Sequence, residues 1–192
     1  AGMARLGDRG SAVQTPGGCG AVRLGAEVLF AAAPDATVWV SDPTWPVHIP
    51  LMGSVGLHFK TYRYYSPELK GLDFAAMLAD LDAASPGDVV LLHGCCHNPS
   101  GVDPTLEQWG VLADLIAQRG LLPMVDFAYQ GMGAGLDEDA AGIRALLERV
   151  PEMIIAVSSS KNIGLYRERA GAVLFVGGDA RAAEAMASQA IS

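Results

Sequence analysis

The fold of this chain is decided by two short segments, Leu121-Leu122-Pro123-Met124-Val125-Asp126-Phe127-Ala128-Tyr129 and Met153-Ile154-Ile155-Ala156-Val157-Ser158-Ser159-Ser160-Lys161. Each begins with an apolar run of five residues, and such runs predict buried strands of a sheet that is covered on both faces. The carboxyl ends of parallel strands meet at one edge of the sheet, where open α/β sheets bind ligands. We therefore expect the Lys161 amine, the Asp126 carboxylate and the Tyr129 phenol to lie near one another at that edge.

Strand-like and helix-like segments alternate along the rest of the chain. Further strands are predicted at residues 37–40, 57–62, 89–92 and 172–176, and helices at residues 21–33, 139–150 and 179–190. Two more helices are predicted from the N-cap residues Asp73 and Thr105, and the second of them should end at Gly120. Strands separated by helices indicate an α/β fold with a mainly parallel sheet, in one domain that spans residues 1–192.

The composition is that of a globular protein, since 51% of the 192 residues are hydrophobic and 18% are charged. A net charge of −8 without a basic tract argues against a nucleic-acid partner. No apolar run is long enough to cross a bilayer, and residues 1–10 hold three charged side chains and no apolar stretch. We therefore expect neither a membrane span nor a signal peptide.

The three cysteines, Cys19, Cys95 and Cys96, do not suggest a disulfide framework. Two of them are adjacent in sequence and pair poorly, and an odd count favours a reducing compartment. The cytoplasm is the expected location.

A glycine-rich turn, Thr15-Pro16-Gly17-Gly18-Cys19-Gly20, precedes the first predicted helix. Glycines expose backbone N–H groups, and the N-terminus of a helix adds positive potential, so together they favour an anion. An ordinary tight turn before a helix has the same sequence pattern, and both interpretations stay open at this point.

The segment His93-Gly94-Cys95-Cys96-His97-Asn98-Pro99-Ser100-Gly101 follows another buried strand and should lie at the same edge. Metal binding is disfavoured, because ligands this close in sequence do not converge as a tetrahedral set and no second Cys/His pair completes one. A turn that presents Asn98 to a ligand, with the cysteines as small buried hydrophobes, is the favoured alternative.

Asp126 needs a partner, because a carboxylate at the end of a buried strand is costly to ionise alone. A ligand cation or His48 would serve, although a lone histidine is more often a structural residue. Trp45, on a proline-flanked loop, is either a core residue or an aromatic plate for a planar ligand.

Lys161 is either a solvated charge or a partly buried nucleophile and proton carrier. The neighbouring serine hydroxyls could hold a phosphate, and Arg169 could bind it with two hydrogen bonds. A lysine that forms a Schiff base and a carboxylate that pairs with a pyridinium nitrogen are the two groups that a pyridoxal phosphate site needs most.

In their order along nearly the whole chain, these motifs resemble the fold-type I, pyridoxal-phosphate-dependent aminotransferases, in particular the aspartate and aromatic amino acid branch. The resemblance implies a three-layer α/β/α fold and a Schiff base between Lys161 and the cofactor. It implies that Asp126 pairs with the ring nitrogen, supported from behind by His48, and that Trp45 stacks on the ring. It further implies that Tyr129 and Asn98 bind the phenolic oxygen, while the phosphate is held by Gly18, Cys19, Ser158 and Arg169.

The implied reaction moves an amino group from aspartate or an aromatic amino acid to a 2-oxo acid such as 2-oxoglutarate. Where the family usually has Ser-Gly-Thr in the phosphate turn, this chain has Gly17-Gly18-Cys19. One or two hydroxyl donors are therefore lost, which predicts somewhat weaker cofactor binding.

Family members are homodimers and roughly twice as long, so the resemblance covers only the central cofactor-binding domain. No arginine here matches those that grip the substrate carboxylates, and we expect them beyond Ser192. A truncated, non-catalytic module that binds pyridoxal phosphate is therefore the alternative to an active enzyme. Without the flanking parts of the family fold, some helices would expose an apolar face. We expect such exposed faces at Leu146, Leu147 and Met186.

Overall fold

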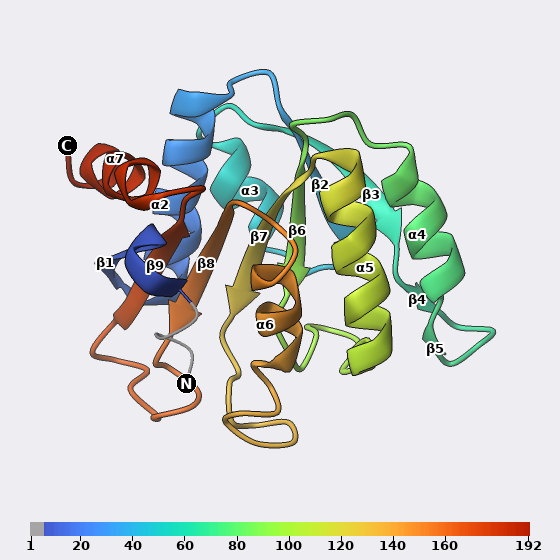
Figure 1. Cartoon of the computed structure of the whole chain (residues 1–192). Coiled ribbons are helices and arrows are strands. Elements are labelled where there is room, and N and C mark those ends of the chain that lie inside the picture. The colour runs from blue at the N-terminus through green and yellow to red at the C-terminus, as the bar shows by residue number, and fades with distance from the viewer. Residues whose placement is uncertain (1–5) are drawn as a thin grey trace.

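The computed structural model describes residues 6–192 as one seven-stranded sheet with helices on both faces (Figure 1). The strand order is β1-β9-β8-β7-β6-β2-β3, and β9 is antiparallel to both of its neighbours while the other strands share one direction. The strands are β1 (Gly10–Pro16), β2 (Thr37–Asp42), β3 (His58–Arg63), β6 (Val89–His93), β7 (Leu122–Phe127), β8 (Met153–Ser158) and β9 (Ala170–Val176). The predicted α/β fold with a mainly parallel sheet is confirmed.

Two helical layers enclose the sheet, and each has its own hydrophobic core. One layer holds α2 (Gly17–Ala32), α3 (His48–Gly53) and α7 (Ala180–Ile191), and the other holds α4 (Phe74–Asp82), α5 (Leu106–Arg119) and α6 (Ala141–Leu147). Successive side chains of β6 alternate between the layers, with Val90 and Leu92 in one core and Val89 and Leu91 in the other. The three-layer arrangement is confirmed. A short 3₁₀ helix, η1 (Gly7–Arg9), and a two-stranded sheet of β4 (Tyr65–Ser66) and β5 (Gly71–Leu72) complete the elements.

The predicted helix caps form as the sequence indicates. The Asp73 carboxylate accepts a hydrogen bond from the N–H of Ala76 at the start of α4. Thr105 and Gln108 form a reciprocal capping box at the start of α5, and Gly120 ends that helix in the left-handed conformation at φ 63°. These caps satisfy the backbone groups that a helix end would otherwise leave unpaired.

Several elements differ from the prediction. The first helix begins at Gly17, so the glycine-rich turn forms its first turn. The start of this helix packs closely on β9, because a Cβ on Gly171 would lie 2.6 Å from the carbonyl carbon of Gly17. Strand β1 and helix α3 were not predicted. Helix α6 is shorter than expected, because Asp139 hydrogen-bonds to the preceding loop rather than capping a helix.

The expected exposure of Leu146 is wrong, because this side chain is fully buried against α5 and the sheet. Leu147 and Met186 are partly buried, and the more exposed apolar side chains lie elsewhere, including Ile163 and Tyr166 in the loop between β8 and β9. Within residues 6–192, no helix combines the length and the apolar character needed to span a membrane. Residues 1–5, half of the segment that we judged to lack a signal peptide, lie outside the described residues.

Candidate active site

A cavity of about 190 Å³ opens where the strands β6, β7 and β8 end. Nine of the ten predicted site residues line it; the exception, His48, lies behind Asp126. The lining consists of Gly18, Cys19, Trp45, His93, Cys95, Asn98, Asp126, Ala128, Tyr129, Ser158, Ser160, Lys161, Tyr166 and Arg169. The sheet edge thus brings together side chains from segments far apart in sequence.

Asp126 is paired with His48, as the buried position of the carboxylate predicts. His48 Nε2 donates to Asp126 Oδ2 over 3.0 Å, and the two side chains are 0% and 11% exposed. The other ring nitrogen, Nδ1, lies 2.9 Å from the hydroxyl of Thr44, which fixes the orientation of the imidazole. The Trp45 ring meets the His48 ring at 89° with centroids 5.2 Å apart, so Trp45 is held at the cavity wall rather than in the core.

Two further histidines extend this network, and one of them, His93, also lines the cavity. His93 Nε2 lies 3.2 Å from the Thr44 hydroxyl, and the rings of His93 and His97 are 4.1 Å apart. Burial lowers the pKa of His93 to about 2, with a contribution from the neighbouring His97 and His48. Burial also lowers the pKa of His97 to about 4. His93 and His97 are therefore neutral hydrogen-bonding groups at physiological pH.

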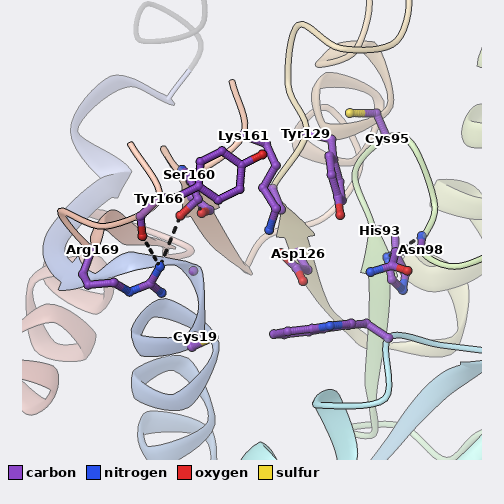
Figure 2. Close-up of a pocket in the computed structure, with 14 residues that line it drawn as sticks. Cys19, His93, Cys95, Asn98, Asp126, Tyr129, Ser160, Lys161, Tyr166 and Arg169 are labelled. Carbon is purple, nitrogen blue, oxygen red and sulfur yellow. Dashed lines mark hydrogen bonds between the residues drawn. The ribbon is translucent and has the colours of Figure 1, made fainter. Parts of the chain in front are cut away.

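Asn98 reaches the cavity from a turn that a carboxylate holds in place. Asp103 accepts hydrogen bonds from the N–H groups of Cys96 (2.6 Å) and His97 (2.9 Å), and Cys96 adopts a left-handed conformation at φ 49°. Figure 2 shows Asn98 beside His93 at one end of the cavity. Within the described residues, no group of three or more His, Cys, Asp or Glu side chains could hold a metal ion.

The three cysteines are unpaired, and Cys95 lies at the cavity, which was not expected. Cys95 is buried, as predicted, but it also lines the cavity. Burial raises the pKa of its thiol, with further contributions from Cys96 and Asp139, so Cys95 stays protonated and unreactive. Cys96 is partly buried, and burial raises its pKa as well.

Lys161 and Tyr129 point into the same part of the cavity, toward Asp126 (Figure 2). The Lys161 amine lies 5.3 Å from the centroid of the Tyr129 ring, in a cation–π arrangement. An amine, a phenol and a carboxylate facing one small space can bind a polar aromatic ligand and move protons within it.

At the opposite end of the cavity, an anion cup is formed by Gly18, Cys19, Ser158, Ser160 and Arg169, with Gly17 packed against the Arg169 guanidinium. A Cβ on Gly18 would lie 2.9 Å from the Ser158 Cβ, and one on Gly17 would lie 2.5 Å from Arg169 Nη2. The guanidinium of Arg169 donates to Ser160 Oγ (3.4 Å) and to the Tyr166 carbonyl (3.0 Å). Backbone N–H groups at the start of α2, two hydroxyls and a guanidinium suit a phosphate.

The sequence analysis did not assign four residues of the site: Thr44, His93, Ser160 and Tyr166. Ser160 had a usable signal, because it belongs to the run of serines whose hydroxyls the sequence already suggests as phosphate partners. Thr44 had none, since its role depends on joining two histidines that are distant in sequence.

Comparison with known proteins agrees with this geometry. The family model described as aminotransferase class I and II matches residues 3–192. The chain is 53% identical over 170 residues to the aromatic-amino-acid aminotransferase of Paracoccus denitrificans, which covers 88% of this chain and 43% of that protein. It is 51% identical over 181 residues to the aspartate aminotransferase of Salmonella typhi, and the match covers 94% of this chain and 46% of that protein.

A solved structure gives the same result. The aromatic-amino-acid aminotransferase of Burkholderia pseudomallei, covalently bound to pyridoxal phosphate, has a TM-score of 0.92 and 37% identity, over 95% of this chain and 46% of that one. The chain thus spans less than half the length of the curated relatives it matches. The family match extends over almost every residue, and the chain belongs to the class I and II aminotransferases.

Proposed function

We propose that this chain is the pyridoxal-phosphate-binding domain of an aminotransferase. The enzyme would transfer the amino group of aspartate or an aromatic amino acid to a 2-oxo acid such as 2-oxoglutarate. The observation that carries the proposal is one cavity lined by the Lys161 amine, by the Asp126 carboxylate that His48 holds from behind, and by an anion cup. The aspartate and aromatic aminotransferases among its relatives support the substrate class.

The cavity fits the cofactor at three chemically different points. The anion cup suits the phosphate, and its fit is tight because a Cβ at Gly17 or Gly18 would fill it. Asp126, fixed by His48, suits the protonated ring nitrogen, and Lys161 suits the aldehyde carbon. Trp45 supplies a flat surface for the ring, and Asn98 and Tyr129 supply donors for the phenolic oxygen.

Bound pyridoxal phosphate supplies an electron sink for the charge that develops at the substrate Cα. Asp126 keeps a proton on the ring nitrogen, and His48 keeps Asp126 in place for that task. Lys161 would hold the cofactor through its amine, and the same amine is placed to accept and return a proton at the substrate Cα. Tyr129 donates its hydroxyl proton toward the phenolic oxygen and so orients the ring.

Complete transamination is proposed for an enzyme of the length of the relatives, because the chain covers only 43–46% of the length of the first of them. We also propose that this protein is a cytoplasmic homodimer. The apolar side chains of Ile163 and of the cavity-lining Tyr166 are 66% and 59% exposed, which supports a partner surface. The three unpaired cysteines support a reducing compartment. A module that binds pyridoxal phosphate without turnover remains the second candidate, supported by the same coverage.

The test is an absorbance titration of the purified chain with pyridoxal phosphate, beside Lys161→Ala. We expect a visible band that is absent from the variant. Lys70→Ala is the matched control, because Lys70 is exposed and shows whether the band arises from surface lysines. A band that persists in Lys161→Ala, or a folded chain without any band, would refute cofactor binding by this site. Adding aspartate or phenylalanine to the loaded chain then separates turnover from binding alone.

A further inference from the structure

The loop that follows Tyr129 is wrapped around a single buried carboxylate. Asp139 is 8% exposed and stands just before α6. Its oxygens accept hydrogen bonds from the backbone N–H groups of Gly131 (2.8 Å), Gly133 (2.9 Å), Ala134 (2.8 Å) and Gly135 (3.4 Å). Four backbone donors converging on one carboxylate make it the anchor of this loop.

The glycines of the loop allow this wrapping. Gly131 has φ 88°, a conformation that other residues rarely adopt. A Cβ on Gly133 would lie 2.7 Å from Asp139 Oδ1, so the carboxylate occupies the space of that side chain. Although burial opposes ionisation, the four backbone hydrogen bonds outweigh it and lower the pKa of Asp139, so the anchor is charged at neutral pH.

The anchor is itself fixed to the protein core. Helix α6 buries Ile143 and Leu146 in the layer that holds α5. A Cβ on Gly142 would overlap the indole ring of Trp109, so the two helices are in close contact at the first turn of α6. Asp139 therefore holds the loop from a rigid element.

Tyr129 lies between two fixed points, the end of β7 at Phe127 and this anchored loop. The Met132 N–H donates to the Tyr129 carbonyl over 3.0 Å, which ties the tyrosine backbone directly to the loop. The direction of the Tyr129 phenol therefore depends on both ends of the segment between β7 and this loop. Asp139 holds the loop end.

We propose that Asp139, which lies outside the cavity lining, is a positioning residue for Tyr129. The inference rests on the proposed function, because Tyr129 matters through its donor to the phenolic oxygen of pyridoxal phosphate. Asp139 acts through the backbone of residues 130–135, and it touches neither cofactor nor substrate.

The test compares Asp139→Asn with Asp137→Asn, a matched control in the same loop whose side chain is 85% exposed and pairs with Arg144. Without cofactor, NMR follows the Tyr129 ring and the exchange of the Gly131, Gly133 and Ala134 amides, with Tyr129→Phe assigning the ring signal. We expect Asp139→Asn to move the ring signal and to speed amide exchange at least tenfold, and the control to do neither. An unmoved Tyr129 signal in Asp139→Asn would overturn the inference.

With pyridoxal phosphate bound, the readout is the pH midpoint of the visible band. Asp139→Asn should shift it in the same direction as Tyr129→Phe, while Asp137→Asn leaves it unchanged; a midpoint like that of the parent would contradict the role. Gly133→Ala is a second variant, because its Cβ disturbs the anchor from the loop side, and it should give the same shift if Asp139→Asn does not fold. If the unsubstituted chain shows no Lys161-dependent band, the proposed function is refuted. The NMR measurements without cofactor still decide whether Asp139 positions Tyr129.

Discussion

His48 Nε2 lies 3.0 Å from Asp126 Oδ2, and this contact joins the first residue of α3 to the end of β7 across 78 positions of sequence. Within the described residues, no other side chain hydrogen-bonds to the Asp126 carboxylate. Because His48 is fully buried, the contact also fixes α3 and the Trp45 loop against the sheet. One pair therefore positions both the group for the ring nitrogen and the aromatic wall of the cavity.

Replacing His48 by leucine should weaken cofactor binding about tenfold, or about 1.4 kcal/mol. Leucine fills the buried site with an apolar side chain but leaves the Asp126 carboxylate without its hydrogen-bond donor, which costs about 1–3 kcal/mol. A fluorescence or absorbance titration with pyridoxal phosphate measures the effect. His58→Leu, on the exposed surface of β3, is the control and should bind like the parent. Unchanged affinity in His48→Leu would show that Asp126 needs no support.

Gly17→Ala should impair the anion cup through Arg169. Gly17 has φ 74°, and an added Cβ would lie 2.5 Å from Arg169 Nη2, so the guanidinium has to move. Gly87→Ala is a matched control, because Gly87 has φ 88° but open space around its Cβ position. Both variants should lose about 1–2 kcal/mol of stability from backbone strain.

Only Gly17→Ala should also raise the dissociation constant for pyridoxal phosphate, by about tenfold or more. Chemical denaturation measures the first effect, and the absorbance titration measures the second. If Gly17→Ala and Gly87→Ala bind pyridoxal phosphate with equal affinity, the position of the Arg169 guanidinium does not affect phosphate binding.

The parts of this fold that the sequence predicts are those with a strong local cause. The strands β6, β7 and β8 lie within about two residues of their predicted bounds, because short apolar runs bounded by polar residues are typical of buried strands. Helix α5 is bounded by a capping box and a left-handed glycine, both of which are visible in the sequence. A partner for Asp126 was predicted from a physical requirement, since a buried carboxylate needs one. His48 was one of two candidates, and the family resemblance singled it out.

The parts that were missed depend on distant partners. Strand β1 is an edge strand of alternating exposure, and it is held by antiparallel pairing with β9, about 160 positions later. Nothing local marks that pairing, nor the reversed direction of β9. The roles of Thr44 and Asp139, at and near the site, were missed for the same reason. Each depends on contacts that form only when the loops fold.

Cys19→Thr should strengthen cofactor binding about fivefold. Cys19 lines the cavity in the first turn of α2, where a thiol is a weaker hydrogen-bond donor to phosphate than a hydroxyl. The phosphate acceptor is charged, and the exchange of a weak donor for a stronger one contributes about 1 kcal/mol. The measurement is the pyridoxal phosphate titration, with Cys19→Ala as the control that changes the side chain without adding a donor. If threonine and alanine give the same affinity, the residue at position 19 does not reach the phosphate.

The stability of the chain without cofactor should fall as the pH drops from 6.5 to about 5, because of His93 and His97. Their pKa values in the folded chain are lowered to about 2 and about 4, whereas an unfolded histidine titrates near 6.5. Below pH 6.5 the unfolded chain binds protons that the folded chain does not, so acid favours unfolding. Each histidine can contribute up to about 1.4 kcal/mol per pH unit in this window, and its full stabilising effect is present above pH 6.5.

The variant His97→Gln isolates one of these contributions. It removes a titrating group that is stacked on Tyr64 and bonded to Ser41 and Ser100, so it should lower stability at pH 7 as well. The diagnostic quantity is therefore the slope of the unfolding free energy against pH, measured by urea denaturation between pH 6.5 and 5. That slope should be flatter in His97→Gln than in the parent, and unchanged in the exposed control His58→Gln. If His97→Gln has the same slope as the unsubstituted chain, His97 takes up a proton as readily in the folded chain as in the unfolded chain. That result would contradict the burial of the His97 ring between Tyr64 and His93.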